Sequence, residues 1–241
     1  MASSKGHILT GCSGFSYKEW KGHFYPEGVP AKAWFEYYCT HFPTLELNVT
    51  FYRFPRLETL QGWYRRSPAS FVFAVKAPRL ITHLRQFNDT GLLQEEFYHV
   101  IREGLGEKLG PVLYQLPAKT AYHPATLDNI LRNMDDGFTN VVEFRHVTWW
   151  RDDVYEALSA KGVTFCSVSY PDLPDWVAPG RGTVYYRFHG VPSLYRSSYA
   201  PAFLDQVLEQ IGKGRSAYLF FNNTASGAAI RNAEMVLRKL H

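Results

Sequence analysis

The sequence predicts a single-domain α/β barrel of the TIM type, with eight strand-helix units over residues 1–241. Short apolar runs of strand composition alternate with segments of helical period along the chain. The length of 241 residues also matches the roughly 250 residues typical of such barrels. A doubly wound open sheet is the alternative, because pattern alone does not show closure, but no G-x-G-x-x-G follows the first predicted strand.

Eight runs have the composition of buried parallel strands. They are short, rich in β-branched and aromatic residues, and bounded by turn residues. The predicted strands are His7–Cys12, Leu45–Phe51, Phe71–Lys76, Pro111–Leu116, Val141–Phe144, Thr164–Val168, Thr183–Phe188 and Ala217–Phe221.

Helical segments follow most of these strands. Their apolar residues recur at helical spacing, and proline or glycine marks several starts and ends. The predicted helices are Ala31–His41, Leu57–Arg66, Leu92–Glu107, Pro124–Met134, Asp152–Lys161, Ala202–Ile211 and Ala225–Leu240. The connection Tyr170–Arg181 is rich in Pro and Gly, so the sixth helix is predicted to be short or missing.

The composition is typical of a globular protein with a slightly basic surface. Hydrophobic residues make up 46% and charged residues 20%, which excludes wholesale disorder, and the net charge is +4. No apolar run reaches the roughly 18 residues of a membrane span, and the first residues lack the apolar core of a secretory signal. Three cysteines without a C-x-x-C motif fit a reducing compartment. We therefore expect a cytoplasmic protein with no membrane partner.

Polar residues occur at the carboxyl ends of the predicted strands, where barrels of this type carry their active sites. A period of two places Glu46 and Asn48 on one face of their strand, and likewise Glu143 and Arg145. Burying charges costs several kcal/mol each unless they pair, so their convergence indicates a functional site. The predicted strand-end residues are Glu46, Asn48, Lys76, Gln115, Glu143, Arg145, Arg187, His189, Asn222 and Asn223. Internal ion pairs, such as Glu46–Lys76 or Glu143–Arg187, are the structural alternative.

The chemistry of this set favours a small anionic or sugar-like substrate. Three cations, two of them arginines, suit a carboxylate or a phosphate. The predicted anion-binding cations are Lys76, Arg145 and Arg187, and the predicted catalytic residues for proton transfer are Glu46, Glu143 and His189. The predicted function is an acid/base enzyme of hydrolase or isomerase type.

Asn222 and Asn223 are predicted to bind a hydroxyl or a phosphate of the substrate. The stretch 222–227 is expected to open the last helix, whose free N–H groups attract anions. An ordinary Thr or Ser N-cap is the alternative interpretation of this stretch.

The segment from Phe15 to Pro26 interleaves aromatic residues with lysines and a histidine. Such a composition is found where bases or sugars stack, and a packed hydrophobic lid is the alternative. Tyr17 in this segment and His83 after the third strand are predicted substrate contacts at the rim. With the basic net charge, this segment makes a nucleic-acid-binding or nucleic-acid-processing protein the alternative function.

No cofactor is predicted, and its identity, if there is one, is left open. The sequence has no G-x-S-x-G, H-E-x-x-H, Walker A or kinase signature. Glu46, Glu143 and His189 are of the types that bind metals. The neighbouring lysine and arginines would repel a divalent cation, so a metal is only a minor alternative.

Nine short motifs carry a resemblance to a known family. They are Gly11–Tyr17 with Trp20, Phe24–Pro26, Leu45–Arg53, Phe73–Lys76, Thr82–His83, Gln115–Pro117, Glu143–His146, Arg187–Gly190 and Phe221–Asn223. With these motifs the sequence resembles the YecE-like family, also called domain of unknown function 72. The resemblance covers nearly the whole chain, implies a TIM-type barrel and implies no particular catalytic activity. The chain has Cys12 and Phe15 where the family pattern leads us to expect Thr or Ser and Trp.

Overall fold

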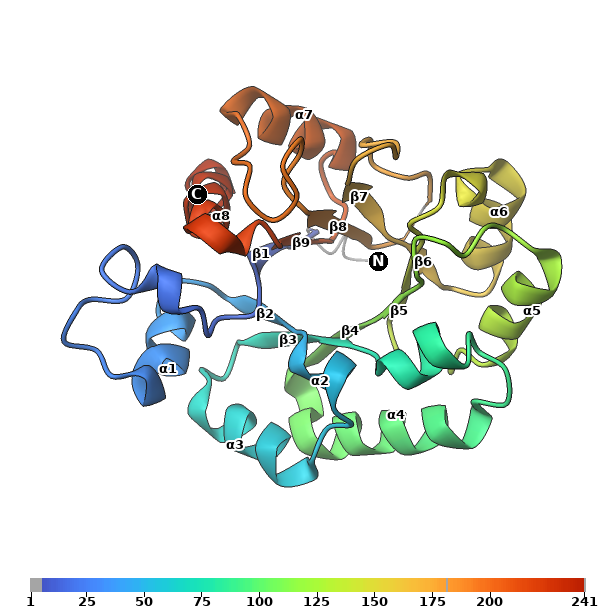
Figure 1. The fold of residues 1–241 in the computed structure, drawn as a ribbon, viewed down its shortest axis with the longest axis horizontal. Coiled ribbons are helices and arrows are strands. Elements are labelled where there is room, and N and C mark those ends of the chain that lie inside the picture. The colour runs from blue at the N-terminus through green and yellow to red at the C-terminus, as the bar shows by residue number, and fades with distance from the viewer. Residues whose placement is uncertain (1–5, 181, 241) are drawn as a thin grey trace. The chain divides into compact units, whose positions relative to one another are not determined.

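The computed structural model describes residues 6–180 and 182–240, in which parallel strands alternate with helices (Figure 1). These residues divide into two compact units. One unit joins the residues up to Leu45 with those from Cys166 onward, and the other runs from Glu46 to Phe165. That residues 1–241 form a single domain stays a prediction. None of the described helices has the length and apolarity required to cross a bilayer.

The discontinuous unit contains a parallel sheet of four strands with mostly apolar residues. Its order is β1 (Ile8–Ser13), β9 (Ala217–Phe221), β8 (Val184–Phe188) and β7 (Ser167–Ser169). Gly11 lies opposite Phe220, and Tyr185 lies opposite Tyr218. The aromatic rings of Phe188 and Phe221 stack with their centroids 4.3 Å apart, so large apolar side chains fill the space beside this sheet.

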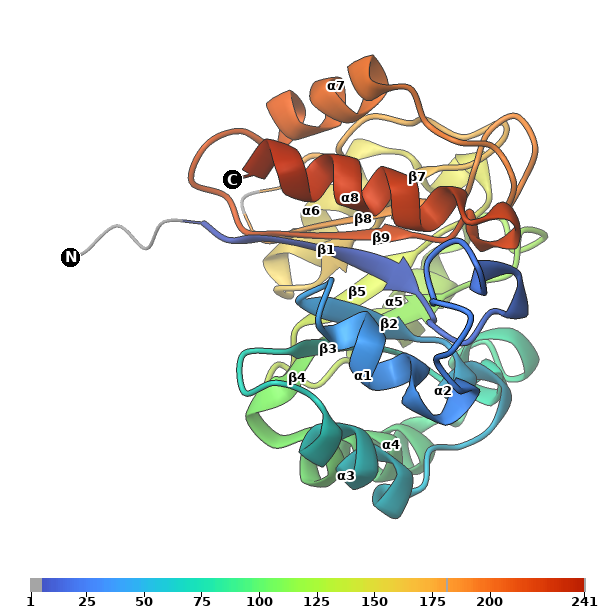
Figure 2. The same ribbon diagram turned by 90° about the vertical axis from the view of Figure 1, so that its left-hand side faces the viewer.

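Three helices belong to this unit, and each buries an apolar stripe, as helices covering a sheet do. They are α1 (Trp34–Cys39), α7 (Pro201–Ile211) and α8 (Ala228–Leu240). Figure 2 shows α8 running alongside β1 and β9. Short turns η1 (Lys18–Trp20), η2 (Ala31–Ala33) and η6 (Thr224–Ser226) complete the unit.

The continuous unit contains β3 (Val72–Lys76), β4 (Leu109–Gln115), β5 (Asn140–Glu143) and β6 (Thr164–Phe165), which pair in parallel in this order. The boundary between the units falls within β2 (Thr44–Leu47). The helices of this unit are α2 (Val49–Tyr52), α3 (Leu57–Arg66), α4 (Gly91–Leu105), α5 (Pro124–Arg132) and α6 (Asp152–Ala160). Its short turns are η3 (Leu80–Leu84), η4 (Gly106–Lys108) and η5 (Val147–Trp149). Figure 1 shows α3 and α4 lying side by side.

The structure corrects the predicted second strand, which ends at Leu47 rather than at Phe51. Asn48 has helical backbone angles and precedes α2, so it does not share a strand face with Glu46. The hydroxyl of Thr50 lies 3.0 Å from the carbonyl oxygen of Leu47 and 2.6 Å from that of Lys76. The single hydroxyl proton is thus shared between two carbonyl oxygens, and this contact holds the chain in a helical turn, which β-branched composition alone does not predict.

The predicted strand Thr164–Val168 is also divided, so the described residues contain nine strands where eight were predicted. Phe165 pairs with Val142 of β5, whereas Ser167 pairs with Tyr186 of β8. Cys166 belongs to neither ladder. The two halves pair with different strands, β6 with β5 and β7 with β8, which a five-residue run of strand composition does not reveal.

Most of the predicted helices are confirmed, with Leu57–Arg66 found at the predicted bounds. The predicted loop after the sixth strand has no helix in residues 170–180, and Arg181 lies outside the described residues, as do residues 1–5 and 241.

Candidate functional site

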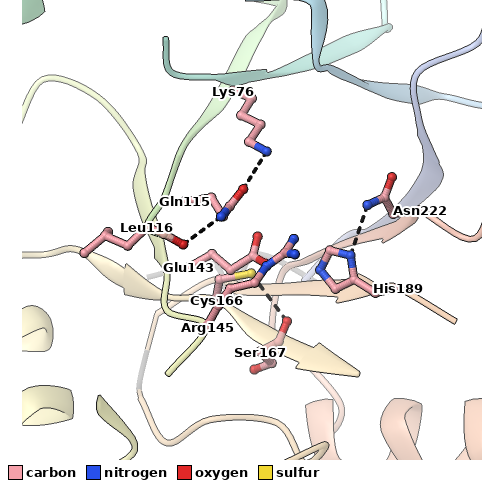
Figure 3. Close-up of polar contacts among 9 residues, drawn as sticks. All are labelled: Lys76, Gln115, Leu116, Glu143, Arg145, Cys166, Ser167, His189 and Asn222. Atoms are coloured by element: carbon pink, nitrogen blue, oxygen red, sulfur yellow. Dashed lines mark hydrogen bonds and ion pairs between the residues drawn. The ribbon is translucent and has the colours of Figure 1, made fainter. Parts of the chain in front are cut away.

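Polar side chains end three neighbouring strands of the continuous unit. Lys76 is the last residue of β3, Gln115 of β4 and Glu143 of β5, and Gln115 lies directly opposite Glu143 in the ladder. All three are buried. The parallel register therefore places a cation, an amide and a carboxylate at one end of one sheet, as the sequence predicts (Figure 3).

Hydrogen bonds fix the orientation of the first two groups. The Nζ atom of Lys76 donates to Oε1 of Gln115 over 2.8 Å, and Nε2 of Gln115 donates to the carbonyl oxygen of Leu116 over 2.6 Å (Figure 3). The same ammonium lies 4.1 Å from the centre of the Phe51 ring. Lys76 is therefore held by an amide oxygen and an aromatic face at the end of β3.

Glu143 and Arg145 form a buried ion pair. The Nε atom of Arg145 lies 2.6 Å from Oε1 of Glu143, whose side chain is 0% exposed (Figure 3). Removing two charges from water costs several kcal/mol per ion, and their attraction offsets this cost only in good geometry. A charged pair is therefore maintained next to the buried ammonium-amide pair of the neighbouring strands.

His83, in the turn η3 after β3, lies close to both charged groups. Its ring packs edge-on against Phe51 with 4.9 Å between the centroids, and its Nδ1 atom lies 2.9 Å from the hydroxyl of Thr82. Burial, followed by the positive charges of Lys76 and Arg145, lowers the pKa of His83 to about 4, against the opposing effect of Glu143. The imidazole is neutral near pH 7, so it can accept a proton or a hydrogen bond.

Glu46 within β2 and Asn48 just after it lie in different environments. Glu46 is fully buried within the strand. Asn48 is half-buried, and its Oδ1 atom has no hydrogen-bond partner among the described residues. Buried polar atoms usually have partners, so this amide oxygen retains the capacity to bind a ligand or water.

The discontinuous unit carries a second group of the predicted residues. Arg187, near the end of β8, is 1% exposed, and His189 follows the strand fully buried. The amide nitrogen of Asn222 lies 3.0 Å from Nδ1 of His189 (Figure 3). With the amide donating, Nδ1 accepts, and the neutral ring carries its proton on Nε2. Tyr170 packs edge-on against this imidazole, with 5.5 Å between the ring centroids.

Asn223 takes part in a structural network. Its Nδ2 atom donates to the carbonyl oxygen of Ser197 over 2.8 Å and to Oδ1 of Asn232 over 3.0 Å. Its own Oδ1 atom has no partner among the described residues, and the same is true of Oγ of Ser13 at the end of β1. Asn223 therefore links its loop to α8 through Asn232, and its Oδ1 atom is a buried acceptor without a partner among the described residues.

The stretch 222–227 does not open the last helix directly. Residues 224–226 form the turn η6, Gly227 has a left-handed φ of +68°, and α8 begins at Ala228. No side chain caps η6, and Ser226 instead donates to the carbonyl oxygen of Arg196. The prediction that residues 222–227 open the last helix is therefore wrong, because a left-handed residue separates the turn from α8. Anion binding by Asn222 and Asn223 stays a prediction.

The first loop is a packed structure. Trp20 and Tyr25 are fully buried, Tyr25 stacks on Trp34 with centroids 4.6 Å apart, and the indole of Trp20 donates to the carbonyl oxygen of Thr224 over 2.9 Å. The hydroxyl of Tyr17 donates to the carbonyl oxygen of Ser13 over 2.5 Å. The aromatic rings of this loop thus serve mainly as packing, and the nucleic-acid alternative stays a prediction without their support.

Known proteins share the sequence pattern of this chain. The family model described as "Protein of unknown function DUF72" matches residues 9–241. The chain belongs to the DUF72 family. The resemblance to the YecE-like family is thereby confirmed. The UPF0759 protein YunF of Bacillus subtilis (strain 168) is similar, with 22% identity over an alignment of 265 positions that covers 92% of each chain.

Solved structures of DUF72 proteins share the fold. A DUF72 family protein of Thermotoga maritima MSB8 is 29% identical and has a TM-score of 0.84, over 97% of this chain and 99% of that one. A DUF72 family protein of Enterococcus faecalis V583 is 18% identical with a TM-score of 0.77, over 97% and 95% of the two chains. These matches confirm the predicted fold class, a TIM-type α/β barrel.

In this DUF72 protein, two residues that contact His83 are not predicted as site residues from the sequence. Phe51 was assigned to a strand, yet α2 brings its ring against both Lys76 and His83. Thr82 binds the imidazole, a contact that its position beside His83 in sequence only suggests. Within residues 6–180 and 182–240, no three His, Cys, Asp or Glu side chains are grouped so that they could hold a metal ion.

Proposed function

We propose that this DUF72 protein is an acid/base enzyme that binds a small substrate carrying a phosphate or carboxylate, or a sugar-like substrate, at the carboxyl ends of the strands. The observation that carries the proposal is the cluster of Lys76, His83, Glu143 and Arg145. It combines two cations with a neutral imidazole and a carboxylate.

Lys76 and Arg145 are the groups proposed to bind the anionic part of the substrate. Lys76 and Arg145 are almost entirely buried, so an anion that meets them is removed from water and attracted more strongly than at a surface. Arginine presents several donors in a plane, which suits carboxylate and phosphate oxygens. The substrate charge would then offset part of the cost of burying these cations.

The imidazole and the carboxylates account for the acid/base chemistry. A histidine kept neutral beside cations keeps one ring nitrogen free to accept a proton or a hydrogen bond, which an imidazolium does not have. A carboxylate in a different environment supplies a partner of different pKa. His83 joins the sequence-predicted proton-transfer residues Glu46 and Glu143 of the same unit in this role. In the discontinuous unit, taken by itself, His189 remains a proposed proton-transfer residue, and Arg187, Asn222 and Asn223 remain proposed contacts, because their strands end in polar groups as well.

Ligand binding tests the anion site. A panel of phosphate esters, sugar phosphates and small carboxylates would be screened by thermal shift, and hits would be measured by calorimetry. Lys76→Gln and Arg145→Gln should each weaken a hit by roughly 10- to 150-fold, because a hydrogen bond to a charged group contributes about 1.5–3 kcal/mol. Lys161→Gln, at an exposed position of the same unit, is the matched control and should leave binding unchanged.

Turnover of the bound compounds tests the enzyme proposal. His83→Gln should lower kcat by roughly 100-fold or more while leaving binding nearly intact, because general acid or base catalysis contributes about that much. Folded Lys76→Gln and Arg145→Gln variants with unchanged affinity for every hit would contradict the site. If the compounds bind but NMR detects no turnover of any of them, the proposal of an enzyme is contradicted, whereas the proposal of an anion-binding site still holds.

A further inference from the structure

A separate cavity of about 290 Å³ lies in the continuous unit, between α2 and the start of α3. We call it the α2–α3 pocket. It is lined by Val49, Thr50, Arg53, Phe54, Pro55, Arg56, Thr59, Leu60 and Trp63. Most of these side chains are apolar, and the polar ones are two arginines and two threonines. An apolar wall with a few converging polar groups is typical of a small-molecule site.

The two arginines of the pocket have no acidic partner. Across residues 6–180 and 182–240, no ion pair or hydrogen bond engages the guanidinium of Arg53 or of Arg56, whereas Arg145 and Arg151 each bind a carboxylate. The nearest acidic residue in sequence, Glu58, is exposed and does not line the cavity. The charge of the pocket is therefore positive and uncompensated.

The surrounding segment strengthens this charge. Residues 49–88 contain seven Lys or Arg and only one acidic residue, whereas the whole chain has a net charge of +4. The positive charge of the chain is thus concentrated in this segment. Such a local excess of cations attracts anions and accelerates their association at low salt.

Besides its positive charge, the pocket has aromatic side chains that could contact a ligand. Trp63 is half-buried and lines the pocket together with Phe54, which packs edge-on against Phe97 of α4 with centroids 6.1 Å apart. An indole beside a cavity is a good surface for a planar ring, and arginine adds a cation that also stacks on rings. No side chain caps the start of α3, so its first N–H groups add to the attraction for an anion.

We propose that the α2–α3 pocket binds an aromatic phosphate of nucleotide type, with its planar ring against Trp63 and its phosphate between Arg53 and Arg56. Two arginines suit a phosphate, which carries more charge and more acceptor oxygens than a carboxylate. The volume of about 290 Å³ limits the ligand to about one nucleotide. Such a group is supplied by a free mononucleotide or by the 5′-phosphorylated end of a strand. This proposal goes beyond the strand-end enzyme and does not depend on it.

Calorimetry with AMP, adenosine and inorganic phosphate tests the proposal on the full chain. AMP should bind. Adenosine, which lacks the phosphate, and inorganic phosphate, which lacks the planar ring, should each bind at least about tenfold more weakly. The double variant Arg53→Gln/Arg56→Gln should lose at least about tenfold in AMP affinity. Arg65→Gln, at an exposed position of α3 that does not line this pocket, is the control and should bind AMP as the wild type does.

Two further variants make the assignment specific. Trp63→Leu keeps an apolar wall without an aromatic face, and it should weaken AMP while leaving phosphate binding unchanged. Lys76→Gln should leave AMP binding unchanged, because Lys76 belongs to the strand-end site. Circular dichroism and thermal unfolding would confirm that each variant is folded.

Several outcomes would overturn the proposal: no AMP binding at millimolar concentration, equal affinity for AMP and phosphate, or loss of AMP binding in Lys76→Gln with retention in the arginine double variant. The last result would assign the nucleotide to the strand-end site. A 5′-phosphorylated dinucleotide distinguishes the two ligand sources. Tighter binding than AMP would identify a strand end, and weaker binding a free nucleotide, and both results support the pocket.

Discussion

Protonation of His83 is the most direct test of the charged cluster at the strand ends. Burial is the largest cause of its lowered pKa of about 4, followed by the charges of Lys76 and Arg145. The unfolded chain has an ordinary histidine with a pKa near 6.5. The unfolded state therefore takes up a proton that the folded state resists, and stability falls as the pH drops from 6.5 to about 4.

The magnitude follows from the difference between the two pKa values. Each pKa unit corresponds to about 1.36 kcal/mol, so the difference between 6.5 and about 4 gives an upper value of about 3.4 kcal/mol. His83 is only partly buried, and solvent screens the charges around it. We therefore expect this residue to account for about 1–2 kcal/mol of lost stability across the window, and no further loss below it.

Urea unfolding of three proteins measures this contribution. The wild type should lose about 1–2 kcal/mol more than His83→Gln between about pH 7.5 and about pH 4.5, because the variant has no imidazole to protonate. His99→Gln, at an exposed position on α4, controls for removing a histidine and should behave as the wild type. Equal losses in the wild type and in His83→Gln would refute the reasoning, and so would an NMR titration in which the His83 signal moves near pH 6.5.

Three further predictions concern the folded core. Trp20→Phe should cost about 1–3 kcal/mol in urea unfolding, because the carbonyl oxygen of Thr224 loses its indole donor in a buried place. Lys108→Met should cost about 1–3 kcal/mol, because the buried ammonium donates to the carbonyl oxygens of Tyr64 and Ser67 at the end of α3; an unchanged denaturation midpoint would contradict this. The native protein should react with a thiol reagent only upon unfolding, since all three cysteines are buried: Cys12, Cys39 and Cys166. Rapid labelling of the native state would show that this burial is incomplete.

The sequence predicts the elements of this fold well, because neighbouring residues decide them. The apolar period of residues 57–66 gives α3 at its observed bounds, and the run 217–221 gives β9. Two failures share a physical cause. The end of β2 depends on the bond of Thr50 to the carbonyl oxygen of Lys76, and the division at Cys166 depends on which strands pair on either side. Neither interaction lies within the local window from which the elements were predicted.

The sequence predicts which residue types form the candidate site, but it does not predict which of these side chains contact one another. Parallel register places Gln115 beside Glu143 once both are known to end adjacent strands. The turn that places His83 against Phe51 is set by tertiary packing. Sequence reasoning therefore named His83 only as a rim contact, although its perturbed pKa makes it a central group of this cluster.

Stability alone does not account for the cluster. Well-packed apolar side chains in place of a buried ion pair are often neutral or stabilising, so Glu143 with Arg145 is weak support for a purely structural role. The suppressed protonation of His83 adds a second cost in the same place, because it destabilises the fold at acidic pH. A rearrangement that moved either cation away from the imidazole would relieve only part of that cost, because burial is its largest cause. These two costs share Arg145 and occur in one small group of side chains. Such costs are expected where charge and a neutral imidazole serve a ligand, and this physical argument favours the proposed anion-binding acid/base site over a purely structural ion pair.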